Sequence, residues 1–235
     1  MFNSYLFIRL RILYNRLFKN NQLQDNEPES IKAIFNNYYH NNHWGSPESI
    51  SGPGSEEKVT ELLLPQINKL FTDYKIQSVL DIPCGDFNWM QNVDLKNINY
   101  NGSDIVEEMI ESNNQKYQQK NLSFQVLDLT SDELPQVDLI ICRDCLVHFS
   151  NENIFKALRQ IKKSKSKYLL TTSFNKFPGN YNIPTGKWRP LNLRTSPFKF
   201  PKPVCLIDEL EFKAVPKWYK KSLALWEIAD IKIKC

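Results

Sequence analysis

The feature that most constrains the fold is an alternation, between residues 76 and 173, of short apolar runs with polar stretches of helical periodicity. Five runs have the length and composition of strands: 76–82, 99–105, 122–129, 137–142 and 167–173. Apolar residues recur with helical spacing over 106–120 and 151–163, which predicts two helices, and a short helix is predicted at 88–92. This order predicts a mostly parallel α/β sheet with helices on both faces, a three-layer α/β/α architecture. Runs 203–208 and 222–228 predict an antiparallel pair at its C-terminal edge.

Length and composition allow one such domain, which we place at 31–235. The chain has 235 residues, of which 41% are hydrophobic and 24% charged, and no apolar run is long enough for a transmembrane bundle. Residues 1–30 are predicted to lie outside this domain, as an N-terminal helix and a linker. Within them, 2–18 mix aromatic and aliphatic residues with arginines, which predicts a basic amphipathic helix. We expect that helix to lie on a membrane surface; the alternative is that it packs on its own domain or on a second copy of the chain.

Cysteines and charges exclude several classes of protein. The five cysteines are odd in number and mostly lie in apolar runs, so we expect reduced thiols in the cytoplasm, with the protein peripheral to a membrane if 2–18 binds one. Cys142 and Cys145 lack a second pair with metal-ligand spacing, so no metal is expected. Beyond residue 20 the chain has 26 basic and 26 acidic residues, which makes nucleic acid an improbable partner. Between Lys176 and Lys221, ten Lys and Arg face three acidic residues, which fits an anionic substrate or a solvated face.

Two features precede the first predicted strand. Residues 40–55 gather Gly, Pro and Ser around Trp44 and predict a lid loop over a ligand, the alternative being a surface loop. Residues 56–71 have helical spacing. We expect Ser55 to cap this helix and Pro65 to kink or split it.

Four predicted strands have an aspartate within two residues of their carboxyl end: Asp81, Asp104, Asp128 and Asp144. Because ligands of open parallel sheets bind at the carboxyl ends of the strands, these four side chains should converge on one site. The first of them is followed by a tight turn that contains Gly85. Together the acidic ends and the glycine turn indicate a nucleoside site.

The segments HWGSPESISGPGS, LDIPCGDFNWM, CRDCLVHFS and TGKWRPLNL resemble class I S-adenosylmethionine-dependent methyltransferases, and more narrowly a bacterial-type subfamily of them. The resemblance runs from about Val59 to Leu225. It implies a Rossmann-like sheet, S-adenosylmethionine as cofactor, and an acidic residue that holds the ribose hydroxyls. Asp104, which stands 23 positions after Asp81, matches that residue.

The predicted cofactor site combines the glycine turn, the strand ends and the lid loop. Gly85 allows close approach of the backbone, and the N–H groups of its turn are expected to receive the methionine carboxylate. Asp104 is expected to accept hydrogen bonds from the ribose hydroxyls, and Asp128 from the adenine amino group. The full set of predicted cofactor contacts is Trp44, Ser49, Ser51, Gly52, Asp81, Cys84, Gly85, Asp86, Phe87, Trp89, Asp104, Ile105, Asp128, Leu129 and Arg143.

For the chemistry, His148 is the one histidine after the fourth strand, where an acceptor should lie, and imidazole suits a general base near neutral pH. The alternative is that His148 packs at the start of the helix that Ser150 caps. Asp144 is the second candidate, as base or as ligand of an acceptor hydroxyl, and its alternative is one more cofactor contact.

Residues 174–203 are rich in Pro, Asn and aromatics without helical period, and predict a substrate-side insertion. Tyr181 and Trp188 offer flat faces to an acceptor, while Arg189 and Asn192 offer hydrogen bonds. The alternative is that the aromatic residues anchor the loop on the core.

These observations favour O-methylation of a small molecule or glycan over three other chemistries. A dinucleotide dehydrogenase needs glycines where Pro83 and Phe87 stand. Amino methylation of nucleic acid would show a proline-rich element where Arg143 and Asp144 stand, and cytosine methylation needs a Pro-Cys nucleophile there. A protein or RNA methyltransferase, or a non-catalytic nucleoside-binding domain of Rossmann-like fold, stays as the alternative.

Overall fold

The structure has the predicted fold class, a mostly parallel α/β sheet with helices on both faces. The computed structural model describes residues 30–209 and 220–233, so the predicted helix at 2–18 lies outside the described residues. Seven strands form one sheet in the order β3-β2-β1-β4-β5-β7-β6. They are β1 (Ser78–Asp81), β2 (Asn99–Asp104), β3 (Leu122–Val126), β4 (Leu139–Cys142), β5 (Tyr168–Phe174), β6 (Cys205–Asp208) and β7 (Lys221–Glu227). Strands β1 to β5 are parallel, whereas β7 runs antiparallel to both β5 and β6, which confirms the predicted edge pair.

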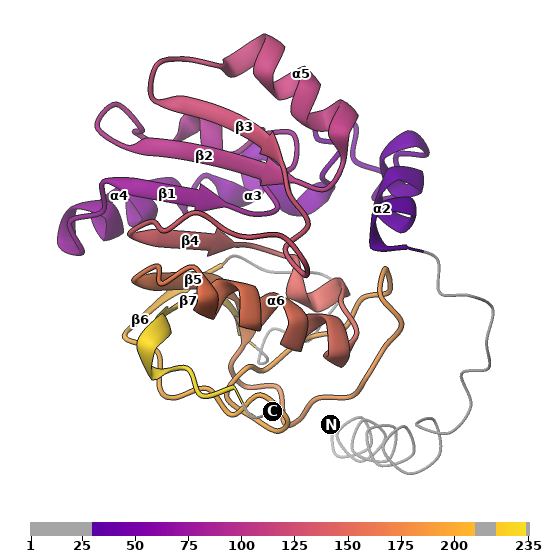
Figure 1. Cartoon of the computed structure of the whole chain (residues 1–235), viewed down its shortest axis with the longest axis vertical. Coiled ribbons are helices and arrows are strands. Elements are labelled where there is room, and N and C mark those ends of the chain that lie inside the picture. The colour runs from indigo at the N-terminus through magenta and orange to yellow at the C-terminus, as the bar shows by residue number, and fades with distance from the viewer. Residues whose placement is uncertain (1–29, 210–219, 234–235) are drawn as a thin grey trace.

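Helices cover both faces of this sheet (Figure 1). On one face, α4 (Leu64–Asp73) and α5 (Glu107–Tyr117) pack with strand residues such as Val79 and Ile141. On the other face, α6 (Asn151–Lys163) packs with Leu80 and Ile140. Since alternate residues of a strand point to opposite faces, strands buried on both faces read as continuous apolar runs.

The register of the strands brings their carboxyl ends together. Asp81 pairs with Gly102 of β2 and with Ile141 of β4, and Asp104 pairs with Val126 of β3. The predicted acidic strand ends therefore meet at one edge of the sheet.

The segment before β1 is split as Pro65 predicts. Helix α3 (Glu57–Thr60) ends before α4 begins, and Pro65 lies in the first turn of α4. The predicted cap at Ser55 is wrong, because Ser55 closes a 3₁₀ turn (Pro53–Ser55) and Glu56 takes the N-cap position of α3. The short helix expected at 88–92 is a 3₁₀ turn, Met90–Asn92.

One helix was not predicted. Helix α2 (Ile31–His40) is capped by Ser30, whose Oγ accepts a hydrogen bond from the Ala33 N–H at 3.1 Å. It stands beside the carboxyl ends of the parallel strands (Figure 1), where Lys32 and His40 each pair with a glutamate of α5 at 3.3 Å. Among the described residues, no helix combines the length and the apolar character that crossing a membrane requires.

Candidate functional site

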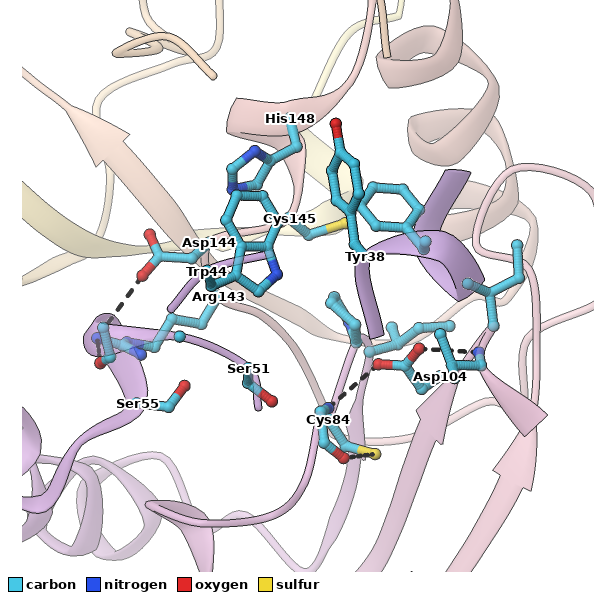
Figure 2. Close-up of a pocket in the computed structure, with 18 of the residues that line it drawn as sticks. Tyr38, Trp44, Ser51, Ser55, Cys84, Asp104, Arg143, Asp144, Cys145 and His148 are labelled. Carbon is cyan, nitrogen blue, oxygen red and sulfur yellow. Dashed lines mark hydrogen bonds and ion pairs between the residues drawn. The ribbon is translucent and has the colours of Figure 1, made fainter. Parts of the chain in front are cut away.

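A cavity of about 500 Å³ lies at the carboxyl ends of the parallel strands. Its walls come from α2, the loop 41–55, the turn after β1, the ends of β2 to β4 and the insertion after β5. Figure 2 shows Asp104 and Cys84 on one side of this space and Tyr38, Trp44 and His148 on the other. The volume is within the range of small-molecule and cofactor sites.

Most of the residues predicted from the sequence line this cavity. They are Trp44, Ser51, Gly52, Cys84, Gly85, Trp89, Asp104, Ile105, Asp128, Leu129, Arg143, Asp144, His148 and Trp188. The predicted residues that do not line it are Ser49, Asp81, Asp86, Phe87, Tyr181, Arg189 and Asn192. Tyr181 packs against the ring of Phe177, with centroids 6.4 Å apart. The partners of the other six are described below.

Asp104 ends β2 with its carboxylate at the cavity wall. The carboxylate accepts hydrogen bonds from the N–H groups of Val106 at 3.0 Å and Gly85 at 3.2 Å. Burial raises the pKa of Asp104 to about 6, although these N–H donors oppose the shift. A ligand that donates hydroxyl groups to this carboxylate would stabilise its charged form.

The turn after β1 is shaped by the loop 41–55. Gly85 has φ +57°, and a Cβ added there would lie 2.1 Å from the Ser51 Oγ, so the glycine makes room for this serine. The Asp86 N–H donates to the Ser51 Oγ at 2.9 Å, and the N–H groups of Cys84 and Phe87 donate to backbone carbonyls. Since the Gly85 N–H is bonded to Asp104, each of these N–H groups has a partner within the protein, and the contact predicted with a methionine carboxylate stays a prediction.

Asp86 fastens the loop rather than contacting the cavity. Its carboxylate accepts hydrogen bonds from the Ser49 Oγ at 2.9 Å, the Ile50 N–H at 2.9 Å and the Ser51 Oγ at 3.0 Å. The predicted roles of Ser49 and Asp86 as cofactor contacts are therefore corrected: both hold Ser51 and the following residues against the turn. The loop forms one wall of the cavity.

Two further predicted contacts belong to the core. The Asp81 carboxylate accepts the Tyr100 hydroxyl at 2.7 Å, and burial raises the pKa of Asp81 to about 7. Phe87 packs among the rings of Tyr100, Tyr117 and Phe124, with centroid distances of 5.1 to 5.2 Å. Phe87 and Trp89 were both predicted as cofactor contacts, but Trp89 lines the cavity and Phe87 does not.

Four charged side chains form a network beside the end of β4. Lys221 Nζ lies 2.6 Å from Asp144 Oδ2 and 2.9 Å from Glu209 Oε2, and Arg143 Nη2 lies 2.7 Å from Glu209 Oε2. Burial acts to raise the pKa of Asp144, but Lys221 and Arg143 hold it well below its usual range. A paired carboxylate of this kind is a poor proton acceptor, so the geometry does not favour Asp144 as the base. Glu209 and Lys221 were not predicted.

His148 is held in one tautomer. Its Nδ1 lies 3.2 Å from the carbonyl oxygen of Lys187, which can only accept, so Nδ1 carries the hydrogen and Nε2 the lone pair. The Gly186 N–H donates to the His148 carbonyl at 2.8 Å, and the Trp44 ring packs 4.5 Å from the imidazole. Burial lowers the pKa of His148 to about 4, so the ring is neutral at pH 7. His148 lies in a 3₁₀ turn, and Ser150 caps α6 as predicted.

The insertion contributes less to the cavity than the sequence suggested. The Arg189 guanidinium is fully buried and donates to the carbonyls of Tyr181 at 2.9 Å and Val147 at 3.1 Å. Asn192 is buried too, and its Nδ2 donates to the Phe177 carbonyl at 2.8 Å. Arg189 and Asn192 therefore stabilise the insertion, and their prediction as substrate contacts is wrong; of the predicted substrate residues, Trp188 lines the cavity.

The sheet order, with an antiparallel β7 between β5 and β6, defines the Rossmann-like fold of class I methyltransferases. Residues 79–165, from β1 through α6, match the family described as "Methyltransferase domain". This part of the chain, less than half of its length, is similar to a methyltransferase domain. The matched segment contains Asp104, Asp128, Asp144 and His148.

Two solved structures are reported as similar to this chain. Magnesium protoporphyrin IX methyltransferase (ChlM) from Synechocystis PCC 6803, solved with bound SAM, has a TM-score of 0.57 and 12% identity over 86% of this chain and 99% of its own. The PH0226 protein from Pyrococcus horikoshii OT3 has a TM-score of 0.42 and 24% identity over 48% of this chain, which spans 55% of that protein. Among curated protein sequences, none matches this chain.

Replacing Gly85 with alanine should displace the loop 41–55. The new Cβ would lie 2.1 Å from the Ser51 Oγ, so the Ser51 side chain has to move and its bonds with Asp86 weaken. We expect thermal unfolding to shift down by several degrees, consistent with a loss of about 1–3 kcal/mol for a strained positive φ and disturbed hydrogen bonds. Gly179→Ala is the control, since a Cβ there meets nothing within 4 Å. Equal unfolding midpoints for the two variants would contradict the role of Gly85.

Proposed function

We propose that this protein transfers the methyl group of S-adenosylmethionine to a hydroxyl of a small molecule or glycan, with His148 as general base. The observation that carries this proposal is the neutral imidazole of His148, in one tautomer, on the wall of the same cavity as Asp104. A hydroxyl acceptor must lose its proton during transfer, and a base within reach of the acceptor meets that need.

The residues at the cavity fit this cofactor. Its lining includes the carboxylates of Asp104, Asp128 and Asp144, which suit a cationic ligand better than a pyrophosphate. Asp104 would hold the ribose hydroxyls. For the methionine carboxylate we assign Arg143, which lines the cavity and whose Nε is buried without a hydrogen-bond partner among the described residues. When bound, the cofactor supplies an electrophilic methyl group on a sulfonium, and the sulfur retains the electron pair of the broken S–C bond.

The chain's own part in the reaction is to position the acceptor and to take its proton. The lone pair of His148 Nε2 accepts the hydroxyl proton as the acceptor oxygen forms its bond to the methyl carbon. The hydrogen bond from Nδ1 to the Lys187 carbonyl keeps Nε2 unprotonated until that moment. The Gly186 N–H, bonded to the His148 carbonyl, fixes the backbone at this point.

The experiment that tests the function is calorimetric titration of the protein with S-adenosylmethionine and S-adenosylhomocysteine. We expect both to bind with a micromolar Kd and to raise the unfolding temperature, since a ligand that binds only the folded state stabilises it. Absence of binding by the folded protein would overturn the proposal.

Replacing His148 with glutamine should slow methyl transfer by about 100-fold or more while S-adenosylhomocysteine still binds, because a positioned general base contributes about 10²–10⁴-fold. The measurement is the release of S-adenosylhomocysteine, by mass spectrometry, with an acceptor found in a screen of hydroxyl compounds. His40→Gln is the control, since His40 is exposed at the end of α2 and pairs with Glu108. Similar rates for the two variants would argue against His148 as the base.

A further inference from the structure

Resting on the proposed function, we propose that the acceptor is a flat aromatic compound with one hydroxyl group, bound between the rings of α2, Trp44 and the insertion. This half of the cavity is lined by Phe35, Tyr38, Trp44, Phe149 and Trp188. Figure 2 shows Tyr38 and Trp44 close to His148 and away from Asp104. A planar ligand can pack its faces and edges against such rings.

The rings are held in place before any acceptor arrives. Gly52 has φ +98°, and a Cβ there would lie 2.7 Å from the Trp44 Cβ, so only glycine lets Trp44 pack at this point. The Tyr38 hydroxyl donates to the Gly186 carbonyl at 3.1 Å, which ties α2 to the insertion. The Tyr38 ring meets Trp44 edge-on at 5.2 Å. A preformed site of this kind binds a rigid ligand at low entropic cost.

Polar groups are few in this half of the cavity, which disfavours a sugar. The Tyr38 hydroxyl already bonds to Gly186, and Asp144 is paired with Lys221. The two side chains predicted to offer hydrogen bonds to the acceptor, Arg189 and Asn192, are buried in the insertion. Each buried hydroxyl of a sugar left without a partner weakens binding. An aromatic acceptor needs one hydroxyl partner, and His148 Nε2 supplies it.

The strength of the base points the same way. With a pKa of about 4, the His148 imidazole is a weak proton acceptor. An aromatic hydroxyl such as that of tyrosine has a pKa of about 10, far below the value of about 15.7 for water. A base this weak suits the aromatic hydroxyl, which is more acidic than water.

The test titrates the protein, saturated with S-adenosylhomocysteine, with 2-naphthol, 7-hydroxycoumarin and methyl α-glucopyranoside in a calorimeter. We expect at least one of the two aromatic compounds to bind with a Kd below 1 mM, on the order of a weak small ligand, and the glucoside to give no heat of binding. Phe35→Leu and Trp44→Leu, which replace a flat ring by an aliphatic chain, should each weaken aromatic binding about tenfold, in line with the contribution of one stacked ring.

The outcomes separate this inference from the function on which it rests. If S-adenosylhomocysteine binds but neither aromatic compound does, or if the glucoside binds instead, the aromatic acceptor is overturned and the methyltransferase activity stands. The inference is also overturned if both leucine variants, folded and saturated with S-adenosylhomocysteine, bind the aromatic compound as the unaltered protein does. If S-adenosylhomocysteine itself fails to bind, the proposed function falls first.

Discussion

Replacing Asp104 with alanine should lower the affinity for S-adenosylhomocysteine by at least 100-fold. The carboxylate lies on the cavity wall at the end of β2, where we assign it to the two ribose hydroxyls. A hydrogen bond to a charged group contributes about 1.5–3 kcal/mol, so losing two costs about 3–6 kcal/mol, or roughly 10² to 10⁴ in Kd. Isothermal calorimetry with the alanine variant and the unaltered protein measures this difference directly.

Asp138→Ala is the matched control for this prediction. Asp138 also accepts backbone hydrogen bonds, from the N–H groups of Ser78 at 2.9 Å and Gln77 at 3.0 Å. It precedes β4, at the opposite edge of the sheet from the cavity, so its loss should lower stability and leave the affinity unchanged. If both variants bind S-adenosylhomocysteine as the unaltered protein does, Asp104 does not hold the cofactor.

The same carboxylate predicts a pH dependence. Burial raises the pKa of Asp104 from 3.8 to about 6. In the proposed site, the cofactor's hydroxyls bind the ionised form of this carboxyl. We therefore expect the Kd to rise about tenfold for each pH unit below 6 and to level off above pH 7. The stability of the ligand-free protein changes in the opposite direction to the affinity: a lower pH weakens cofactor binding but favours the folded state. The contribution of a buried carboxyl with a raised pKa is fully present below 3.8 and is lost as pH rises through 6.

The sequence predicts those parts of the site that depend on local pattern. Apolar runs that end in an aspartate locate Asp104, Asp128 and Asp144, because strand ends of a parallel sheet converge whatever the intervening loops do. Residue type alone does not reveal which side of a turn is buried. Phe87 packs into the core whereas Trp89, two positions on, lines the cavity. For the same reason Arg189, whose charge suggested exposure, is fully buried among carbonyls.

Long-range contacts account for what the sequence did not predict. The N–H of Asp86 bonds to Ser51, which lies 35 positions earlier, and no local signal relates the two. Helix α2 is a different case, because the local sequence does indicate it: Ile31, Phe35 and Tyr38 have helical spacing after the N-cap Ser30. Lys221 begins β7, and the pairing of β7 with β5 brings it beside Asp144, 77 positions earlier in the chain.

Replacing Lys221 with methionine should destabilise the protein by about 3–5 kcal/mol, the cost of removing one partner from a buried ion pair. The Lys221 side chain is 5% exposed and its ammonium lies within 2.9 Å of both Asp144 and Glu209. Methionine fills the space but leaves two carboxylates with Arg143 as their remaining cation among the four residues of the network. Urea unfolding at pH 7 measures the loss of free energy.

Lys220→Met is the control, since the Lys220 side chain is 58% exposed and lies 3.9 Å from the exposed Asp208, an arrangement that contributes about 0–1 kcal/mol. The effect of Lys221→Met should also depend on pH. Lys221 helps to hold the pKa of Asp144 below 3.8, so the stability that this pair contributes is present above pH 3.8 and is lost as the carboxyl is protonated. The difference between Lys221→Met and the unaltered protein should therefore narrow as the pH falls below 4. A difference that is small at pH 7, or that stays constant with pH, would mean that the buried charges are compensated without Lys221.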